Sequence, residues 1–190
     1  MSTITQEQVE FYRDNGYLVV EGLAAAEVEE LRADTLRLCR GEYRHERLPP
    51  MDAALSDEEV LSHFLCLHHP HKISPVIMEA GVKHRGMVAA LAALIGPDVK
   101  CMQSMLFVKP PGFQGQAWHQ DEIYIPTRDG SLMGGWIALD DATVENGCLW
   151  VLPGSQRGCS TSSGRTATRT SLTSRGSRTD LTRVARWRWR

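Results

Sequence analysis

The sequence predicts an α+β protein in which N-terminal helices accompany a β-barrel or jelly roll. Two observations predict this class. Apolar residues recur at helical spacing as far as Ile95, and from Val99 onward they occur in short runs separated by turn residues. The 190 residues suffice for one or at most two domains, and 42% of them are hydrophobic, as in proteins that bury a core.

Four helix patterns lie in the first half of the chain. Capping boxes, in which Ser or Thr is followed three residues later by Glu or Gln, mark two of the starts. Glycine marks two of the ends, and in one case proline follows it. The predicted helices are residues 5–15, residues 24–40, a short helix that begins near Ser56, and residues 84–95. A polar loop, residues 41–50, separates the second from the third.

Five short runs are rich in β-branched and aromatic residues and predict strands. A Lys-Pro-Pro-Gly turn follows the second run, and Asn146-Gly147 predicts a hairpin between the last two. A full jelly roll has about eight strands, so we expect an incomplete one. The predicted strands are residues 17–20, 99–108, 118–125, 134–139 and 148–152.

Charge and composition change abruptly after residue 158. Residues 1–158 carry a net charge of −9, whereas residues 159–190 carry +7 and are rich in Ser, Thr and Arg. We therefore expect a domain over residues 1–158 and a disordered basic tail over 159–190 that does not complete the barrel. Two other interpretations are a shifted reading frame and a nucleic-acid-binding arm in which Trp187 and Trp189 stack between arginines.

Several segments that would direct the chain elsewhere are not visible in the sequence. The N-terminus lacks the apolar stretch of a signal peptide, and no apolar run is long enough to span a membrane. The five cysteines show no Cys-x-x-Cys spacing. We expect reduced thiols and a cytoplasmic location, with no membrane partner.

His119 and Asp121 form the most informative pair. Side chains two residues apart on a strand lie on the same face, so the predicted strand 118–125 would present both in one direction. A non-haem Fe(II) centre uses two histidines and one carboxylate, and the pair supplies two of those three ligands. The competing interpretation is an ordinary surface salt bridge or hydrogen bond.

The residues around this pair resemble the phytanoyl-CoA dioxygenase family of Fe(II)/2-oxoglutarate oxygenases, in particular its branch of phytanoyl-CoA-hydroxylase-domain-containing proteins. The resemblance covers most of residues 5–156. It implies N-terminal helices packed on a double-stranded β-helix (jelly-roll, cupin-like) core. The matching motifs are FYRDNGYLVVEG (11–22), QSMLFVKPP (103–111), WHQDEIY (118–124) and GGWIALDDATVENGCLWVLPGS (134–155).

This resemblance implies roles for individual residues. His119 and Asp121 match the iron ligands, and Met105 and Trp136 match positions that line the 2-oxoglutarate pocket. Lys72 resembles the upstream lysine that contacts this co-substrate. Core packing remains the other interpretation for Met105 and Trp136, and a solvated surface position that for Lys72.

The implied reaction consumes O2 and 2-oxoglutarate, releases succinate and hydroxylates a small-molecule substrate. Related halogenating enzymes lack the carboxylate ligand, so Asp121 indicates hydroxylation. The metal and co-substrate carry the difficult chemistry, while the protein binds and orients them.

The sequence departs from the family pattern after residue 158. The family has a distal His ligand and an Arg that pairs with 2-oxoglutarate, and no His follows His119 here. We therefore expect weak Fe(II) and 2-oxoglutarate binding. Upstream histidines could lend a ligand, although a surface tract with adventitious affinity is the simpler interpretation of HHPH (68–71). Three functional classes stay open: a hydroxylase, a non-catalytic remnant, and a cupin-type metal or small-molecule binding module.

Overall fold

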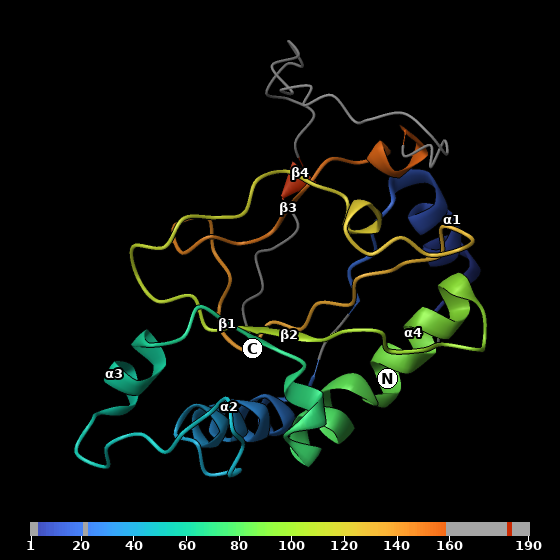
Figure 1. Ribbon diagram of the computed structural model, residues 1–190. Coiled ribbons are helices and arrows are strands. Elements are labelled where there is room, and N and C mark those ends of the chain that lie inside the picture. Colours follow the sequence, from blue (N-terminus) through green and yellow to red (C-terminus); the bar gives the residue numbers. More distant parts are fainter. Residues whose placement is uncertain (1–3, 21–22, 159–181, 184–190) are drawn as a thin grey trace. The chain divides into compact units, whose positions relative to one another are not determined.

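The computed structural model describes residues 4–20, 23–158 and 182–183, the last pair as backbone only. The chain forms two compact units, which we describe separately. The helical unit comprises the described residues 23–116 and 135–140. The turn unit comprises residues 4–20, 117–134, 141–158 and 182–183. Figure 1 labels the elements of both units.

Helix α2 (Ala25–Cys39) provides the apolar face on which the helical unit is built. Val28, Leu31 and Leu38 lie on this face at helical spacing, and Leu38 has no exposed surface. These side chains form one buried cluster with Leu23, Leu48 and Ile77. The predicted helix 24–40 is therefore confirmed, with its packing face explained by the apolar period.

Asp34 interrupts that apolar face. Its side chain is only 2% exposed, and it accepts hydrogen bonds from the hydroxyl groups of Tyr43 and Ser74. The next residue, Thr35, is half-buried and donates to the Leu31 carbonyl at 2.8 Å. A buried carboxylate is tolerated here because two donors replace its lost water.

The other predicted helices are confirmed with shorter or shifted ends. Helix α3 (Asp57–Ser62) starts at the Ser56–Glu59 capping box, and α4 (Arg85–Ile95) ends at Gly96. Arg40, the C-cap of α2, pairs with Asp57 at the start of α3. Neither the 3-10 turn η1 (Pro70–Lys72) nor the π-helical turn η2 (Ile77–Val82) was predicted, and strand β1 (Cys66–His68) was not predicted either.

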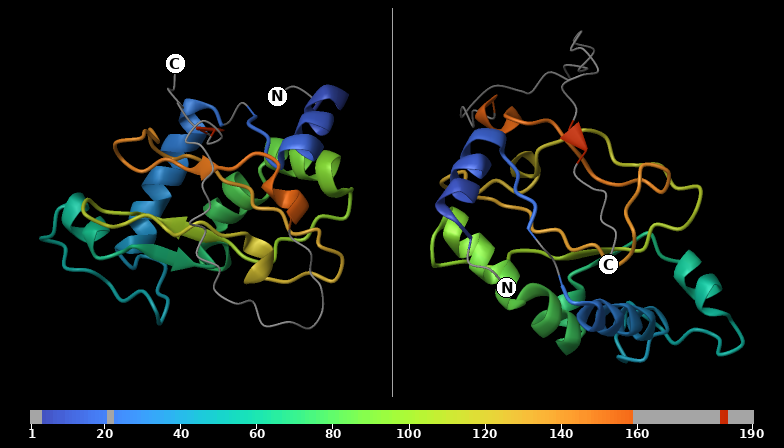
Figure 2. Two further views of the ribbon diagram at one scale, coloured as in Figure 1. Left: turned by 90° about the horizontal axis from the view of Figure 1, so that it is seen from above. Right: turned by 180° about the vertical axis from the view of Figure 1, so that it is seen from behind.

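A two-stranded antiparallel sheet completes the helical unit. Strand β1 (Cys66–His68) pairs with β2 (Met105–Phe107), with His68 opposite Met105 and Leu67 opposite Leu106. Figure 2 shows the two strands side by side. Backbone bonds from His69 N to the Ser104 carbonyl and from Val108 N to the Leu65 carbonyl extend the pairing at both ends.

In the turn unit, helix α1 (Gln6–Asn15) is tied to the 3-10 turn η4 (Ser155–Gly158). Gln156 Nε2 donates to the Arg13 carbonyl at 3.0 Å, and Arg157 pairs with Asp14 at 2.6 Å. The predicted capping box at Thr5 and the stop at Gly16 are both confirmed, since Gly16 adopts a φ of 79°. A short strand β3 (Trp150–Val151) pairs with β4 (Thr182–Arg183).

The strand predictions are only partly correct. Strands β2 and β3 lie within the predicted segments 99–108 and 148–152, but they cover only three and two residues. Segments 17–20, 118–125 and 134–139 form no strand, and 118–125 contains the 3-10 turn η3 (Asp121–Ile123) instead. Residues 144–147 do turn, as Asn146-Gly147 predicted, yet no hairpin follows because β3 pairs with β4. A strand needs a bonded partner, and a local pattern does not supply one.

Three further expectations meet the structure here. Among the described helices, none is long and apolar enough to cross a membrane. The described cysteines, at positions 39, 66, 101 and 148, are free thiols. The predicted tail, residues 159–190, lies outside the described residues except for the backbone of Thr182–Arg183.

Candidate metal-ligand pair and its surroundings

A main-chain carbonyl holds the ring of His119. The ring atom Nδ1 lies 2.7 Å from the Ala117 carbonyl oxygen. A carbonyl only accepts, so Nδ1 carries the proton and donates it. This bond leaves Nε2 as the ring nitrogen that can accept a proton or a metal ion. Metal-binding histidines commonly have this arrangement, in which the other ring nitrogen donates to a fixed oxygen.

Asp121 lies opposite that nitrogen. His119 Nε2 and Asp121 Oδ1 are 3.3 Å apart, and the two side chains are 31% and 58% exposed. Because Nδ1 already carries a proton, a bare Nε2 would face the carboxylate with lone pair against lone pair. A cation between or beside the two atoms relieves this repulsion, and it can be a proton on the ring or a metal ion.

The spacing fits a first-row metal ion. Ligand bonds of about 2.0–2.2 Å, set at a right angle, place two donor atoms roughly 3 Å apart. The observed 3.3 Å is close to that value and is well inside the separation of about 5 Å at which the pair could no longer share one ion. The donor set, imidazole nitrogen and carboxylate oxygen, is one that Fe(II) accepts.

The backbone between the two residues is extended, as the prediction required, although no paired strand forms. Gln120 has φ −119° and ψ 130°, and on such backbone side chains two residues apart lie on the same face. The turn η3 begins at Asp121, whose carbonyl accepts from the amides of Tyr124 and Ile125, each at 2.9 Å. This turn brings the Tyr124 ring to the imidazole, edge to face at 5.7 Å between centroids.

Gln120, between the two ligand candidates, anchors their segment. Its Nε2 donates to the Ser155 carbonyl at 2.8 Å, in the same turn η4 that is bonded to α1. The Gln120 side chain therefore links the segment that carries the pair to η4.

Glu122 and Gly134 also shape the site, and the sequence analysis missed both. Glu122 accepts from the backbone and hydroxyl of Thr127, each at 2.6 Å, and from Leu132 N at 3.1 Å. The hydrogen bonds from Thr127 lower the pKa of Glu122. Gly134 leaves room for Asp121, because a Cβ there would lie 3.2 Å from Asp121 Oδ2. An acidic residue followed by the polar segment TRDGS (127–131) was the available signal for Glu122.

The three predicted co-substrate residues belong to the helical unit. Lys72 ends η1 and is exposed, while Met105 begins β2 and is 39% exposed. Trp136 is 44% exposed and follows Gly135, whose position is packed closely against Met87. The exposure of Met105 and Trp136 disfavours the interpretation of these two as fully buried core residues. The exposure of Lys72 agrees with the interpretation of a solvated surface position. Their role toward 2-oxoglutarate stays a prediction.

A third ligand is not found near the pair. Within the described ranges, no group of three or more His, Cys, Asp or Glu side chains could hold a metal ion. Two histidines of the helical unit are engaged in other ways. His71 is buried and bonded to Ser104 through Nδ1, and His84 Nε2 lies 3.3 Å from Glu27. Burial lowers the pKa of His71, with the charges of His69 and Lys72 acting in the same direction.

The comparisons with known proteins assign the chain to a family. The family model described as "Phytanoyl-CoA dioxygenase (PhyH)" matches residues 12–182. Since that match covers most of the sequence, the chain belongs to the phytanoyl-CoA dioxygenase family. The match ends well beyond residue 158, where the recognisable motifs stop.

Curated proteins of this family are similar to the chain over most of its length. It is 30% identical to "Phytanoyl-CoA dioxygenase domain-containing protein 1" of Bos taurus, over 83% of this chain and 67% of that protein. It is 29% identical to "Phytanoyl-CoA dioxygenase 1" of Oryza sativa subsp. japonica, over 82% and 66%. A third relative, "Phytanoyl-CoA dioxygenase, peroxisomal" of Mus musculus, is 28% identical over 83% and 49%.

The chain therefore spans about two thirds of the first two relatives and about half of the third. No solved structure matches the chain.

Proposed function

We propose that the chain is an Fe(II)- and 2-oxoglutarate-dependent dioxygenase that hydroxylates a small-molecule substrate with O2. The observation that supports this most is the pairing of His119 Nε2 with Asp121 Oδ1 at 3.3 Å, with Nδ1 held by a carbonyl. Family membership supports the oxygenase class. A double-stranded β-helix (jelly-roll, cupin-like) core belongs to the same proposal.

His119 and Asp121 would hold the metal ion, and Lys72, Met105 and Trp136 would contact the co-substrate. The ion, when bound with 2-oxoglutarate, supplies the oxidising chemistry. The residues of the chain do the rest. The Ala117 carbonyl fixes the tautomer of His119, Gln120 anchors the segment to Ser155, and Gly134 leaves space for the carboxylate.

Asp121 also bears on the outcome of the reaction. Its carboxylate occupies the position that a halide takes in related halogenating enzymes, so we propose hydroxylation. The position is occupied by a carboxylate that is 58% exposed and within reach of the imidazole, which keeps it available as a ligand.

The alternative is a non-catalytic remnant or a cupin-type metal or small-molecule binding module. Two observations favour it: the described residues contain no three-ligand group, and no His follows His119. Two protein ligands bind Fe(II) less tightly than three, so this chain would bind metal weakly.

Anaerobic Fe(II) titration followed by a succinate assay separates these functions. We expect weak Fe(II) binding that His119→Ala and Asp121→Ala abolish, and that His63→Gln, a histidine outside the pair, leaves unchanged. Succinate release that needs Fe(II), 2-oxoglutarate and both residues establishes the dioxygenase. Metal binding without succinate release establishes the binding module. If His119→Ala and Asp121→Ala bind Fe(II) as the unchanged chain does, the ligand pair is wrong.

Two remaining assignments are part of the proposal. Residues 1–158 form the oxygenase-like domain and residues 159–190 a separate basic tail, whose composition is the sole hint of nucleic-acid binding. We propose a cytoplasmic location, although four matched relatives are named as peroxisomal. Hydrogen exchange on residues 159–190 tests the tail, since fast exchange throughout is expected of a separate disordered segment.

A further inference from the structure

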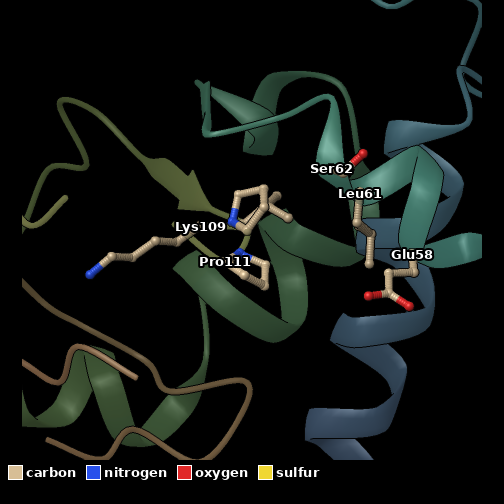
Figure 3. A pocket seen from close by; sticks show the side chains of 7 residues that line it. Glu58, Leu61, Ser62, Lys109 and Pro111 are labelled. Carbon is tan, nitrogen blue, oxygen red and sulfur yellow. The ribbon is translucent and has the colours of Figure 1, made fainter. Parts of the chain in front are cut away.

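A pocket of about 350 Å³ opens in the helical unit between α3 and the turn that follows β2 (Figure 3). Leu61 of α3 forms one apolar wall, and Val108, Pro110 and Pro111 form the other. The volume is at the lower end of the range of roughly 300–1,000 Å³ for ligand pockets. It suits a small organic molecule with an apolar body.

The wall after β2 is rigid and offers few donors. Proline has no N–H and a fixed φ, so Pro110 and Pro111 present apolar rings on a stiff backbone. The Val108 amide is already bonded to the Leu65 carbonyl at 3.1 Å. Lys109, between Val108 and Pro110, has a φ of 47°, which is uncommon for a non-glycine residue.

Two charged residues line the pocket, Glu58 on α3 and Lys109 on the opposite wall, and the negative charge comes from α3. Of the three acidic residues in the first turn of α3, Asp57 pairs with Arg40 and Glu59 caps Ser56. Glu58 has neither role, and within the described part of the chain no hydrogen bond or ion pair engages its carboxylate. Figure 3 shows this carboxylate beside Leu61, whereas the Lys109 side chain extends from the opposite wall away from α3.

Ser62 adds a second polar group of matching character. Its hydroxyl donates to the Glu59 carbonyl at 2.6 Å, so its oxygen retains lone pairs as acceptors. The polar groups on the α3 side therefore consist of a carboxylate and a hydroxyl that accepts. Both are suited to an N–H donor with positive charge, and neither suits an anion.

We propose that this pocket binds a small organic amine, with its apolar body between Leu61 and the Pro110-Pro111 wall and its ammonium group beside Glu58. The site lies in the helical unit and uses none of the residues assigned to metal or co-substrate. It is independent of the proposed oxygenase activity.

Titration of the full chain with three six-carbon probes tests the proposal. Hexylammonium, 1-hexanol and hexanoate share an apolar body and differ in charge. In a chain with 13C-labelled Leu and Val methyl groups, we expect hexylammonium to shift the signals of Leu61 and Val108. At low salt it should bind about two- to fivefold more tightly than hexanol, which is the scale of an exposed ion pair, and hexanoate should bind most weakly.

Glu58→Gln should remove the preference for hexylammonium over hexanol while the methyl shifts persist. Glu30→Gln changes an exposed glutamate on α2 outside the pocket and should leave the preference intact. The proposal is overturned if no probe shifts Leu61 or Val108, if hexanoate binds as tightly as hexylammonium, or if Glu58→Gln keeps the preference.

Discussion

The two units are held together by different forces. In the helical unit, apolar side chains of α2 form a buried cluster with Leu23, Leu48 and Ile77. In the described part of the turn unit, the buried apolar residues are Val9 and Cys148 alone. Exposed hydrogen bonds and the Arg157–Asp14 pair connect its segments instead. The unit that carries the candidate ligands is therefore the less firmly stabilised one.

The difference in what stabilises the two units bears on the candidate site. Polar links of exposed side chains contribute little stability each, but they set direction and spacing. Gln120 and Glu122 act in this way around His119 and Asp121. The apolar cluster of the helical unit supplies stability without placing any of the proposed metal ligands. Four predictions test the contrast, from the largest expected effect to the smallest.

Replacement of a fully buried leucine should have the largest effect. Leu38→Ala removes a side chain with no exposed surface and leaves a cavity, which should lower the free energy of unfolding by about 2–5 kcal/mol. Leu152→Ala in the turn unit, where the side chain is 43% exposed, should change it by less than roughly 0.5 kcal/mol. Urea denaturation measures both. Equal losses would mean that the turn unit has a core of its own.

The two units should also differ in how they respond to loss of an aspartate. Asp34→Ala leaves the hydroxyl groups of Tyr43 and Ser74 without their buried acceptor and should cost about 1–3 kcal/mol. Asp14→Ala breaks the exposed pair with Arg157 and should cost less than about 1 kcal/mol. Salt should reduce the second cost by a larger fraction than the first, because buried Asp34 keeps its hydroxyl donors besides its 3.7 Å pair with Arg37. The measurement is urea denaturation at low and high salt, and equal salt sensitivity of the two costs would contradict the contrast.

Gly134→Ala should weaken the metal site while leaving stability nearly unchanged. The added Cβ would lie 3.2 Å from Asp121 Oδ2, so the carboxylate must shift from its position opposite His119. A displaced ligand of this kind should lower Fe(II) affinity by about tenfold, the lower end of the effects of outer residues on metal sites. Gly115→Ala, which meets nothing within 4 Å, serves as the control in anaerobic titration. Unchanged Fe(II) affinity in Gly134→Ala would contradict the assignment of Asp121 as a metal ligand.

The smallest effect should come from pH. His71 is buried and its pKa lies below the ordinary 6.5, so the folded chain favours the neutral ring. The unfolded chain then binds more protons, and stability falls as pH drops below about 6.5 until the folded form is also protonated. His71→Gln should flatten this part of the stability curve, whereas His63→Gln should not. If the free energy of unfolding depends on pH in His71→Gln as it does in the unchanged chain, another group causes the pH dependence.

The local sequence determined the helices and their ends. Capping boxes at Thr5 and Ser56 and the stops at Gly16 and Gly96 all hold in the structure. These signals depend on hydrogen bonds between residues three or four apart, so they can be read without knowledge of the rest of the chain. The apolar face of α2 was predicted for the same reason, because its period is local.

Strands and the buried carboxylate required the tertiary structure. Segments 118–125 and 134–139 carry strand-forming residues but pair with no other segment among those described, and a strand without a partner leaves its backbone groups unbonded. Asp34 sits on an apolar face that its residue type does not predict. Its partners there are Arg37, one turn along α2, and the hydroxyl groups of Tyr43 and Ser74, which lie outside the helix.

The candidate site combines both kinds of information. The sequence by itself determined that His119 and Asp121 are two residues apart within a family motif, and this spacing keeps their side chains within a few ångströms in either a strand or a turn. Only the tertiary structure decided that the turn η3 brings the Tyr124 ring to the imidazole, that the Ala117 carbonyl selects the tautomer, and that Gln120 reaches Ser155. Spacing limits how far apart two neighbours can lie, but the direction of each side chain depends on contacts with residues that no local pattern identifies.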